Sequence, residues 1–195
     1  ATITAPVSTS VAVLFNNANW LCAKLLIASV QFVADVPHGY MYVASPFRSQ
    51  SVAEYTVFDL NDGAAVHLRE KGEDWLIDCG HRFEYDRIVR PYLQSRGVNR
   101  LDGLVLTHGD ARHIGAAEDV WKELRPRAVF DVVLKDRSQT RRNLHRAMAD
   151  RSFGKRMVAR DNLLELEDGP RLEVLYPPRG LQRSLADDKA LVLRL

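Results

Sequence analysis

The chain has 195 residues, of which 46% are hydrophobic and 27% are charged, a composition typical of an ordinary folded protein with a sizeable core. The net charge of +2 excludes any global electrostatic argument for nucleic-acid binding. Two distant cysteines, Cys22 and Cys79, form no C-x-x-C pair, which excludes a disulfide framework and a zinc-thiolate site.

The first predicted element is an apolar helix over Trp20–Val36, slightly shorter than the roughly 20 residues of a membrane span. Four polar residues, spaced by seven, seven and four, fall on one face of this helix: Asn17, Lys24, Gln31 and Asp35. The stripe favours a helix that lies along a membrane surface or packs beside other segments. A surface helix of a soluble domain fits the spacing equally well. We expect no signal peptide in this segment, because the residues before Val11 lack a positively charged region and a cleavage pattern.

The next region predicts an antiparallel meander of three strands. Strand-like runs over 55–60 and 64–69 flank Asn61-Asp62-Gly63, a hairpin-turn sequence, and a second turn leads into a strand over 75–78. Apolar spacing then predicts a helix over 85–93, with a kink at Pro91 and an end at Gly97.

Strands and helices alternate after this meander. We expect strands over 101–107, 128–134, 163–164, 172–176 and 190–195, and helices over 113–124 and 138–150, the latter capped by Ser138. A meander followed by alternation predicts a mixed α/β (α+β) layered domain. Because the chain starts at Ala1 and stops inside an apolar run, we expect it to be part of a longer protein.

The most informative segment is Leu104–Gly115. A buried strand delivers His108 and Asp110 at its carboxyl end, and His113 returns at the start of a helix. Two imidazoles and a carboxylate that converge suit zinc, manganese or iron. The alternative is structural: His113 begins a helix that Asp110 caps.

Several segments resemble the bacterial DNA-internalisation competence proteins of the ComEC family. Thr107-His-Gly-Asp-Ala-Arg-His-Ile-Gly115 resembles their Thr-His-Pro-Asp-Ala-Asp-His-Ile-Gly motif, which is their version of the metallo-β-lactamase signature. Residues 58–65 are similar to the family's Leu-Asp-Val-Gly-Gln-Gly-Asp-Ala turn and residues 76–80 to its Leu-Ile-Asp-Thr-Gly. Residues 90–106 follow its helix and strand, residues 185–195 resemble its Asn-x-x-Ser-Leu-Val-Leu strand, and residues 19–40 resemble the end of its membrane region.

The resemblance implies an architecture and a location. Residues 1–48 would be the end of the membrane-embedded competence region and a linker, with membrane contact through residues 17–36. Residues 49–195 would be the N-terminal part of a metallo-β-lactamase-like αβ/βα sandwich, incomplete at its C-terminus. The location implied is the bacterial cytoplasmic (inner) membrane, within a larger multi-pass protein.

The resemblance also implies a chemistry. His108, Asp110 and His113 would be the catalytic metal ligands, and zinc- or manganese-bound water would attack a DNA phosphodiester. Asp78 would orient the metal loop from behind the ligands, or it is an ordinary turn aspartate satisfied by backbone amides. No small-molecule cofactor is expected. His67 and His81 have no ligand spacing to this cluster.

Three departures from the family pattern weaken the enzyme interpretation. Arg112 stands where the motif has its second aspartate, a ligand of the second metal, so we expect one ion at most. Ala64 replaces the aspartate of the early turn, and the family's remaining ligands, a Gly-Asp and a His-His-Gly, fall after Leu195. Arg112 itself either pairs with a carboxylate such as Asp78 or Asp110, or holds a phosphate bidentately.

One segment is strongly basic: residues 135–160 hold nine cationic side chains against Asp136 and Asp150. Phe153 is its one aromatic residue, so DNA binding here would be sequence-independent and directed to a single-stranded backbone. The expected DNA contacts are Arg112, Arg141, Arg142 and Arg146. The alternative is an ordinary solvated helix face.

Three functions therefore remain open from the sequence. The leading hypothesis is a DNA-uptake protein whose domain is a metal-dependent phosphodiesterase (nuclease). The alternative is a degenerate, non-catalytic domain that binds DNA or scaffolds the channel, which Arg112 favours. A soluble hydrolase of the same fold rests on fold analogy alone.

Overall fold

The computed structural model describes residues 4–35, 41–43, 53–133, 138–149, 154–167, 169–181 and 190–195. Its contacts divide the chain into two units, Ala1–Met41 and Tyr42–Leu195. Each unit is described by itself.

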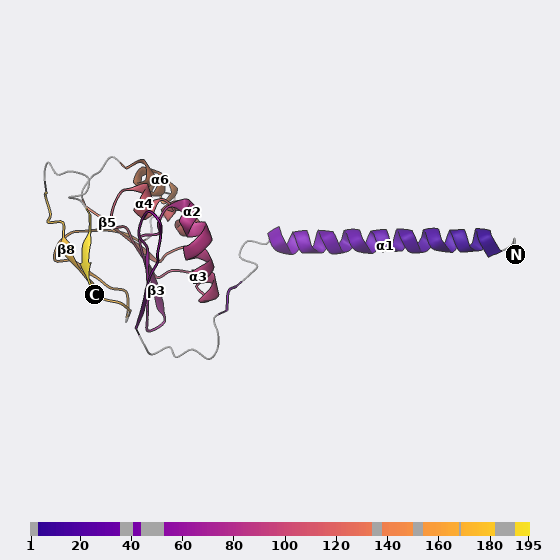
Figure 1. The fold of residues 1–195 in the computed structure, drawn as a ribbon, viewed down its shortest axis with the longest axis horizontal. Helices are drawn as coiled ribbons and strands as arrows, with labels where there is room; N and C mark the ends of the chain where they lie inside the picture. Colours follow the sequence, from indigo (N-terminus) through magenta and orange to yellow (C-terminus); the bar gives the residue numbers. More distant parts are fainter. Residues whose placement is uncertain are drawn as a thin grey trace. The chain divides into compact units, whose positions relative to one another are not determined.

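The first unit is a single helix, α1 (Thr4–Asp35), which begins well before the predicted start (Figure 1). Its segment Val11–Phe32, with 22 residues and a mean hydropathy of 1.4, is long and apolar enough to cross a bilayer. On the predicted polar face, the Lys24 ammonium lies 4.1 Å from the centroid of the Trp20 ring, a cation–π contact.

The second unit contains two sheets. Sheet A has the strand order β1 (Glu54–Val57), β2 (Val66–Glu70), β3 (Glu73–Ile77), β4 (Gly103–Val105), β5 (Ala128–Val132) and β6 (Lys155–Val158). The meander β1–β2–β3 is antiparallel as predicted, whereas β3, β4, β5 and β6 are parallel neighbours. Sheet B is antiparallel and contains β7 (Leu163–Leu164), β8 (Leu172–Tyr176) and β9 (Val192–Arg194).

The predicted helix over 85–93 is a composite. It consists of α2 (Arg82–Glu84), a π-helical turn η1 (Tyr85–Val89) and α3 (Arg90–Ser95). Pro91 lies in the first turn of α3, and because proline has no N–H to donate, the α-helical ladder is interrupted just before it. The expected kink is therefore a π turn.

The remaining helices are α4 (Ala111–Ile114), α5 (Ala117–Leu124) and α6 (Gln139–Ala147). Ser138 caps α6 as predicted, since its side chain accepts a hydrogen bond from the N–H of Arg141. Figure 1 shows α2, α3, α4 and α6 on one side of sheet A and β8 on the other.

Alternating residues of sheet A supply two cores. Leu76, Leu104 and Val129 pack among the helices, whereas Trp75, Val105 and Phe130 pack against residues of sheet B. Trp75 and Phe130 stack with their ring centroids 5.2 Å apart. The helices form one layer, sheet A forms the next and sheet B forms the third. This order of layers confirms the predicted layered α/β architecture.

Candidate functional site

The centre of the candidate site is the carboxylate of Asp78, which follows β3 and is only 2% exposed. Its backbone is left-handed, with φ of 54°, a conformation that aspartate tolerates better than most residues. Oδ1 accepts a hydrogen bond of 2.8 Å from the N–H of Thr107, and Oδ2 accepts one from the Thr107 hydroxyl. His113 Nδ1 lies 3.1 Å from Oδ2. One buried carboxylate thus ties together the ends of β3 and β4 and the helix α4.

The two histidines of the predicted metal loop are neighbours. The ring centroids of His108 and His113 are 5.4 Å apart, in an edge-to-face arrangement. The hydrogen bond of His113 to the Asp78 carboxylate is the main cause that raises the pKa of His113 above its usual value. A carboxylate on Nδ1 leaves Nε2 as the ring nitrogen that can bind a metal, the arrangement by which proteins orient histidine ligands.

Asp110 serves as the cap of α4. Its Oδ1 accepts a hydrogen bond of 3.2 Å from the N–H of Arg112, and its own N–H donates to His108 Nδ1 at 3.3 Å. The capping role that the sequence offered as the alternative for Asp110 is therefore present, and metal ligation by Asp110 stays a prediction.

The Arg112 guanidinium lies between two carboxylates. Nη1 is 3.3 Å from Asp62 Oδ1, and Nε is 3.8 Å from Asp110 Oδ2. The Arg112 side chain is 60% exposed, so the group is held and still open to solvent. The expected pairing with a carboxylate is therefore present at Asp110, while Asp78 pairs with His113 instead.

The loop that carries Asp62 is fixed by its own backbone. Gly63 has φ of 140°, and a Cβ at this position would overlap the carbonyl oxygen of Arg112. Glu84 Oε1 accepts a hydrogen bond of 3.2 Å from the N–H of Asp62. The sequence Asn61-Asp62-Gly63 predicts only a turn. The one signal in it for this site is the glycine, which permits another backbone to approach closely.

The side chains of the site meet only part of what a divalent metal requires. The donor types are suitable, since imidazole and carboxylate bind zinc and manganese. Within the described ranges, however, no three His, Cys, Asp or Glu side chains converge on one point. The residues provide an oriented pair of imidazoles but not the three protein ligands of a catalytic site. Ligation of a metal by His108, Asp110 and His113 stays a prediction.

The predicted DNA contacts on α6 divide into two groups. Arg142 and Arg146 are exposed. Arg141 is buried, and its Nε lies 3.1 Å from Oδ1 of the fully buried Asp131, so its guanidinium serves an internal ion pair. We therefore correct the expected DNA-contact set to exclude Arg141. Lys135, Arg137 and Arg151 of the basic segment lie outside the described residues.

Helix α6 contacts the predicted metal loop directly. The Ser138 hydroxyl, at the N-terminus of α6, donates a hydrogen bond to the carbonyl oxygen of Gly109. His67 and His81 have local roles, as expected from their spacing: His67 is buried 2.8 Å from Asp74, and His81 caps α2. The exposed arginines of α6 and the loop 107–115 therefore belong to one connected region.

Comparisons with known proteins agree with this geometry. Residues 60–178 match the family model described as the metallo-beta-lactamase superfamily. Competence protein ComA of Neisseria gonorrhoeae is 32% identical over 108 residues, which cover 52% of this chain and 16% of that protein. ComE operon protein 3 of Bacillus subtilis (strain 168) is 29% identical over 90 residues, 37% of this chain and 12% of that protein. The matches thus span less than a fifth of either relative.

A solved structure extends the comparison to the fold. MEM-A1, a subclass B3 metallo-beta-lactamase from a soil metagenome library, aligns with a TM-score of 0.50 and 13% identity. The alignment covers 75% of this chain and 55% of that one. At this identity the similarity supports the layered fold and nothing finer.

Proposed function

The chain belongs to the metallo-beta-lactamase superfamily and resembles ComEC-type competence proteins, and on that premise we propose that it acts in DNA uptake. Its domain binds the backbone of single-stranded DNA without regard to sequence, and the Asp78–His113 site does not hydrolyse it. This is the non-catalytic alternative that the sequence leaves open, refined to the residues below.

The observation that carries this proposal is the position of the Arg112 guanidinium between Asp62 and Asp110. The guanidinium lies within pairing distance of both carboxylates and offsets one of their two negative charges. A metal ion would have to displace that guanidinium and would be repelled by it at short range. The same exposed group is suited to bind a phosphate with its planar fork of donors.

The DNA part of the proposal rests on the exposed cations around the site. Arg142 and Arg146 are exposed on α6, the helix whose N-terminal Ser138 contacts Gly109 in the loop 107–115 that also contains Arg112. Lysine and arginine side chains that contact DNA phosphates release the counterions bound to the DNA, and this release raises the affinity of the protein for DNA. Such binding is therefore sensitive to salt and insensitive to sequence.

A second candidate, metal-dependent phosphodiester hydrolysis, is favoured by one observation. The carboxylate of Asp78 orients His113 beside His108, which is how a metal-binding histidine is held in place. With Asp110 released from its cap, the three predicted ligands would hold one zinc or manganese ion. When bound, such an ion supplies an activated water and neutralises phosphate charge.

One experiment separates the two candidates. The full chain, purified in detergent, is equilibrated with zinc or manganese, and its bound metal and its cleavage of labelled single-stranded DNA are measured beside Arg112→Asp. We expect wild type to bind DNA without cutting it, and Arg112→Asp to gain metal. Arg100→Asp, an exposed arginine outside the site, is the matched control and should gain none. A wild type that retains metal and cuts DNA overturns the non-hydrolytic proposal.

We also propose that α1 places the protein at the bacterial cytoplasmic membrane, within a larger multi-pass protein. The support is the apolar segment Val11–Phe32 and the resemblance to competence proteins. Flotation of the full chain with liposomes tests this. A chain that stays at the bottom of the gradient contradicts membrane attachment and favours the soluble hydrolase interpretation.

A further inference from the structure

A polar cavity that does not include the histidine pair lies between the loop that follows β6 and the loop that follows β8. It has a volume of about 410 Å³ and is lined by Arg160, Asp161, Asn162, Pro178 and Arg179. None of the residues assigned to the site above lines it. Its two arginines come from loops that are 19 residues apart in the sequence.

The walls of this cavity are built by backbone hydrogen bonds. The N–H of Arg160 donates to Pro177 O at 2.7 Å, and that of Asp161 donates to Val174 O at 2.9 Å. Arg160 Nε donates to Leu175 O at 3.0 Å, which holds its guanidinium against β8. Over the described ranges, no carboxylate pairs with either Arg160 or Arg179. Arg160 is therefore held in place, and neither arginine is neutralised by an ion pair among the described residues.

The cavity lies at the same edge of the domain as the histidine pair. Because β4, β5 and β6 are parallel neighbours, the residues that follow each strand emerge at one edge. β6 is two strand positions from β4, a distance of roughly 10 Å. The loop that follows β8, which forms the other wall of the cavity, also lies at this edge. Tyr176 at the end of β8 pairs with Val192, and the N–H of the preceding Leu191 donates to Thr107 O at 2.8 Å.

The lining indicates the chemistry of the ligand. Two guanidinium groups and one carboxylate leave one net positive charge, which matches the single negative charge of a phosphodiester. The lining contains no aromatic ring on which a base could stack, so the recognised part is the backbone.

We propose that Arg160 and Arg179 form a binding site for a phosphodiester of single-stranded DNA, next to the Arg112 site on the same edge. This inference rests on the proposed DNA function, which it extends by a second contact point. A strand that passes along this edge is held at both points, so each contact contributes to the same affinity.

The test is binding of a fluorescein-labelled oligothymidylate to the full chain in detergent, followed by anisotropy over a series of salt concentrations. Arg160→Gln/Arg179→Gln should lower the affinity by roughly tenfold or more. It should also reduce the slope of log affinity against log salt by roughly 0.7 for each phosphate that the variant no longer neutralises. Arg179→Gln alone, which removes no hydrogen bond among the described residues, should show part of both effects.

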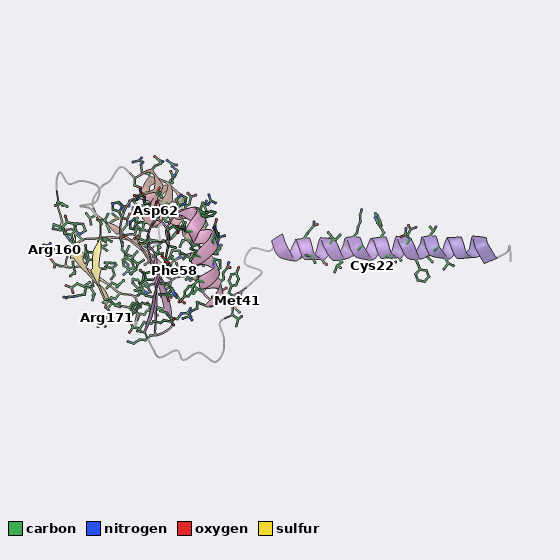
Figure 2. All side chains as sticks on the ribbon, in the orientation of Figure 1. Cys22, Met41, Phe58, Asp62, Arg160 and Arg171 are labelled. Carbon is green, nitrogen blue, oxygen red and sulfur yellow. The ribbon has the colours of Figure 1, made fainter. Side chains whose placement is uncertain are left out.

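The matched control is Arg171→Gln, because Arg171 is an exposed arginine just before the other end of β8, paired with Glu165 at 3.3 Å (Figure 2 labels Arg160 and Arg171). It should leave both the affinity and the slope unchanged, with circular dichroism confirming that all variants fold. Equal affinity of the double variant and wild type, or an equal reduction in Arg171→Gln, overturns the site. A wild type that does not bind the oligonucleotide overturns the proposed DNA function itself.

Discussion

Strand β3 has a buried carboxylate at each end, and the two are treated in opposite ways. Asp78, after its C-terminal end, receives three side-chain and backbone partners from Thr107 and His113. Glu73, its first residue, is 7% exposed, accepts one hydrogen bond of 2.8 Å from the Trp75 indole, and has its Oε1 buried without a partner among the described residues. Burial raises the pKa of Glu73 above its usual value.

The different hydrogen bonding of Asp78 and Glu73 indicates different roles for the two ends of the domain. At the Asp78 end, a charge is buried together with the donors that stabilise it, which is how proteins hold functional groups in fixed positions. At the Glu73 end, a carboxylate is buried with too few donors, a cost that a structure tolerates where nothing requires the charge. Matched substitutions at the two ends test this difference.

The largest effect is expected for Asp78→Ala. It leaves the Thr107 N–H and hydroxyl and the His113 ring without their acceptor, and the free energy of unfolding should fall by about 3 kcal/mol. Asp78→Asn tolerates the same backbone conformation and retains one acceptor, so it should lose about 1 kcal/mol. Urea denaturation measures both. Equal losses would show that the hydrogen bonds at Asp78 are not what stabilises this end.

The next effect compares two glycines, one at each end. Gly63→Ala should cost about 2 kcal/mol, because the new methyl group overlaps the Arg112 carbonyl and displaces the loop. Gly72, in the turn before Glu73, has φ of 87° and open space around a Cβ. Its replacement by alanine should cost about 1 kcal/mol, from backbone strain alone. Thermal unfolding of both variants measures the two losses of stability. Equal losses would contradict the argument that the added methyl group at Gly63 clashes with the Arg112 carbonyl.

A smaller effect of opposite sign is expected for Glu73→Gln. The folded protein binds the Glu73 proton more tightly than the unfolded chain does, because burial raises the pKa. The contribution of Glu73 to stability is therefore full below the unfolded pKa of about 4.3 and is lost as pH rises through the folded pKa. Glu73→Gln should remove this dependence and raise stability at neutral pH by up to about 1 kcal/mol. A stability difference between wild type and Glu73→Gln that does not vary with pH would contradict this prediction.

The smallest effect on stability is expected for Arg112→Gln, below about 0.5 kcal/mol, because its ion pairs are exposed. Its DNA affinity should nevertheless fall by roughly tenfold. Arg127→Gln, at the opposite end, removes a half-buried arginine that pairs with Asp102 at 3.3 Å and with Glu167, and it should leave DNA affinity unchanged. Anisotropy with a labelled oligonucleotide distinguishes the two. Equal reductions in affinity would show that the two ends do not differ in DNA binding.

Much of the fold follows from local sequence signals. The β1–β2–β3 meander, the central strand β4 and the Ser138 cap of α6 have short-range patterns and were predicted. Strand β6 was not, because Lys155, Arg156 and Met157 are exposed and show no apolar alternation. Such an edge strand is defined by its pairing with β5, which no local pattern encodes.

The candidate site was predicted less completely than the fold. The 104–115 motif identified His108 and His113 after β4, and the similarity of residues 76–80 identified Asp78. The structure places Asp78 after β3 and brings it together with both rings. Neither segment identified Asp62, which is 50 residues from Arg112 in the sequence. The burial of Arg141 was also missed, because a helical arginine that faces inward has the same sequence signature as one that faces solvent. Contacts between distant segments decide both cases.

The π turn η1 gives the domain a point where a single residue matters. A π turn accommodates one residue more than an α-helical turn, and it commonly marks a functional region of a helix. Here the turn separates Glu84, which holds the Asp62 loop, from Leu93, which lies in the core. Deleting one residue from Tyr85–Val89 would restore a regular helix and rotate its two ends by about 100° relative to each other. The extra residue therefore changes the rotation between the two ends of the helical segment. As a result, Leu93 faces the core while Glu84 faces the loop that carries Asp62.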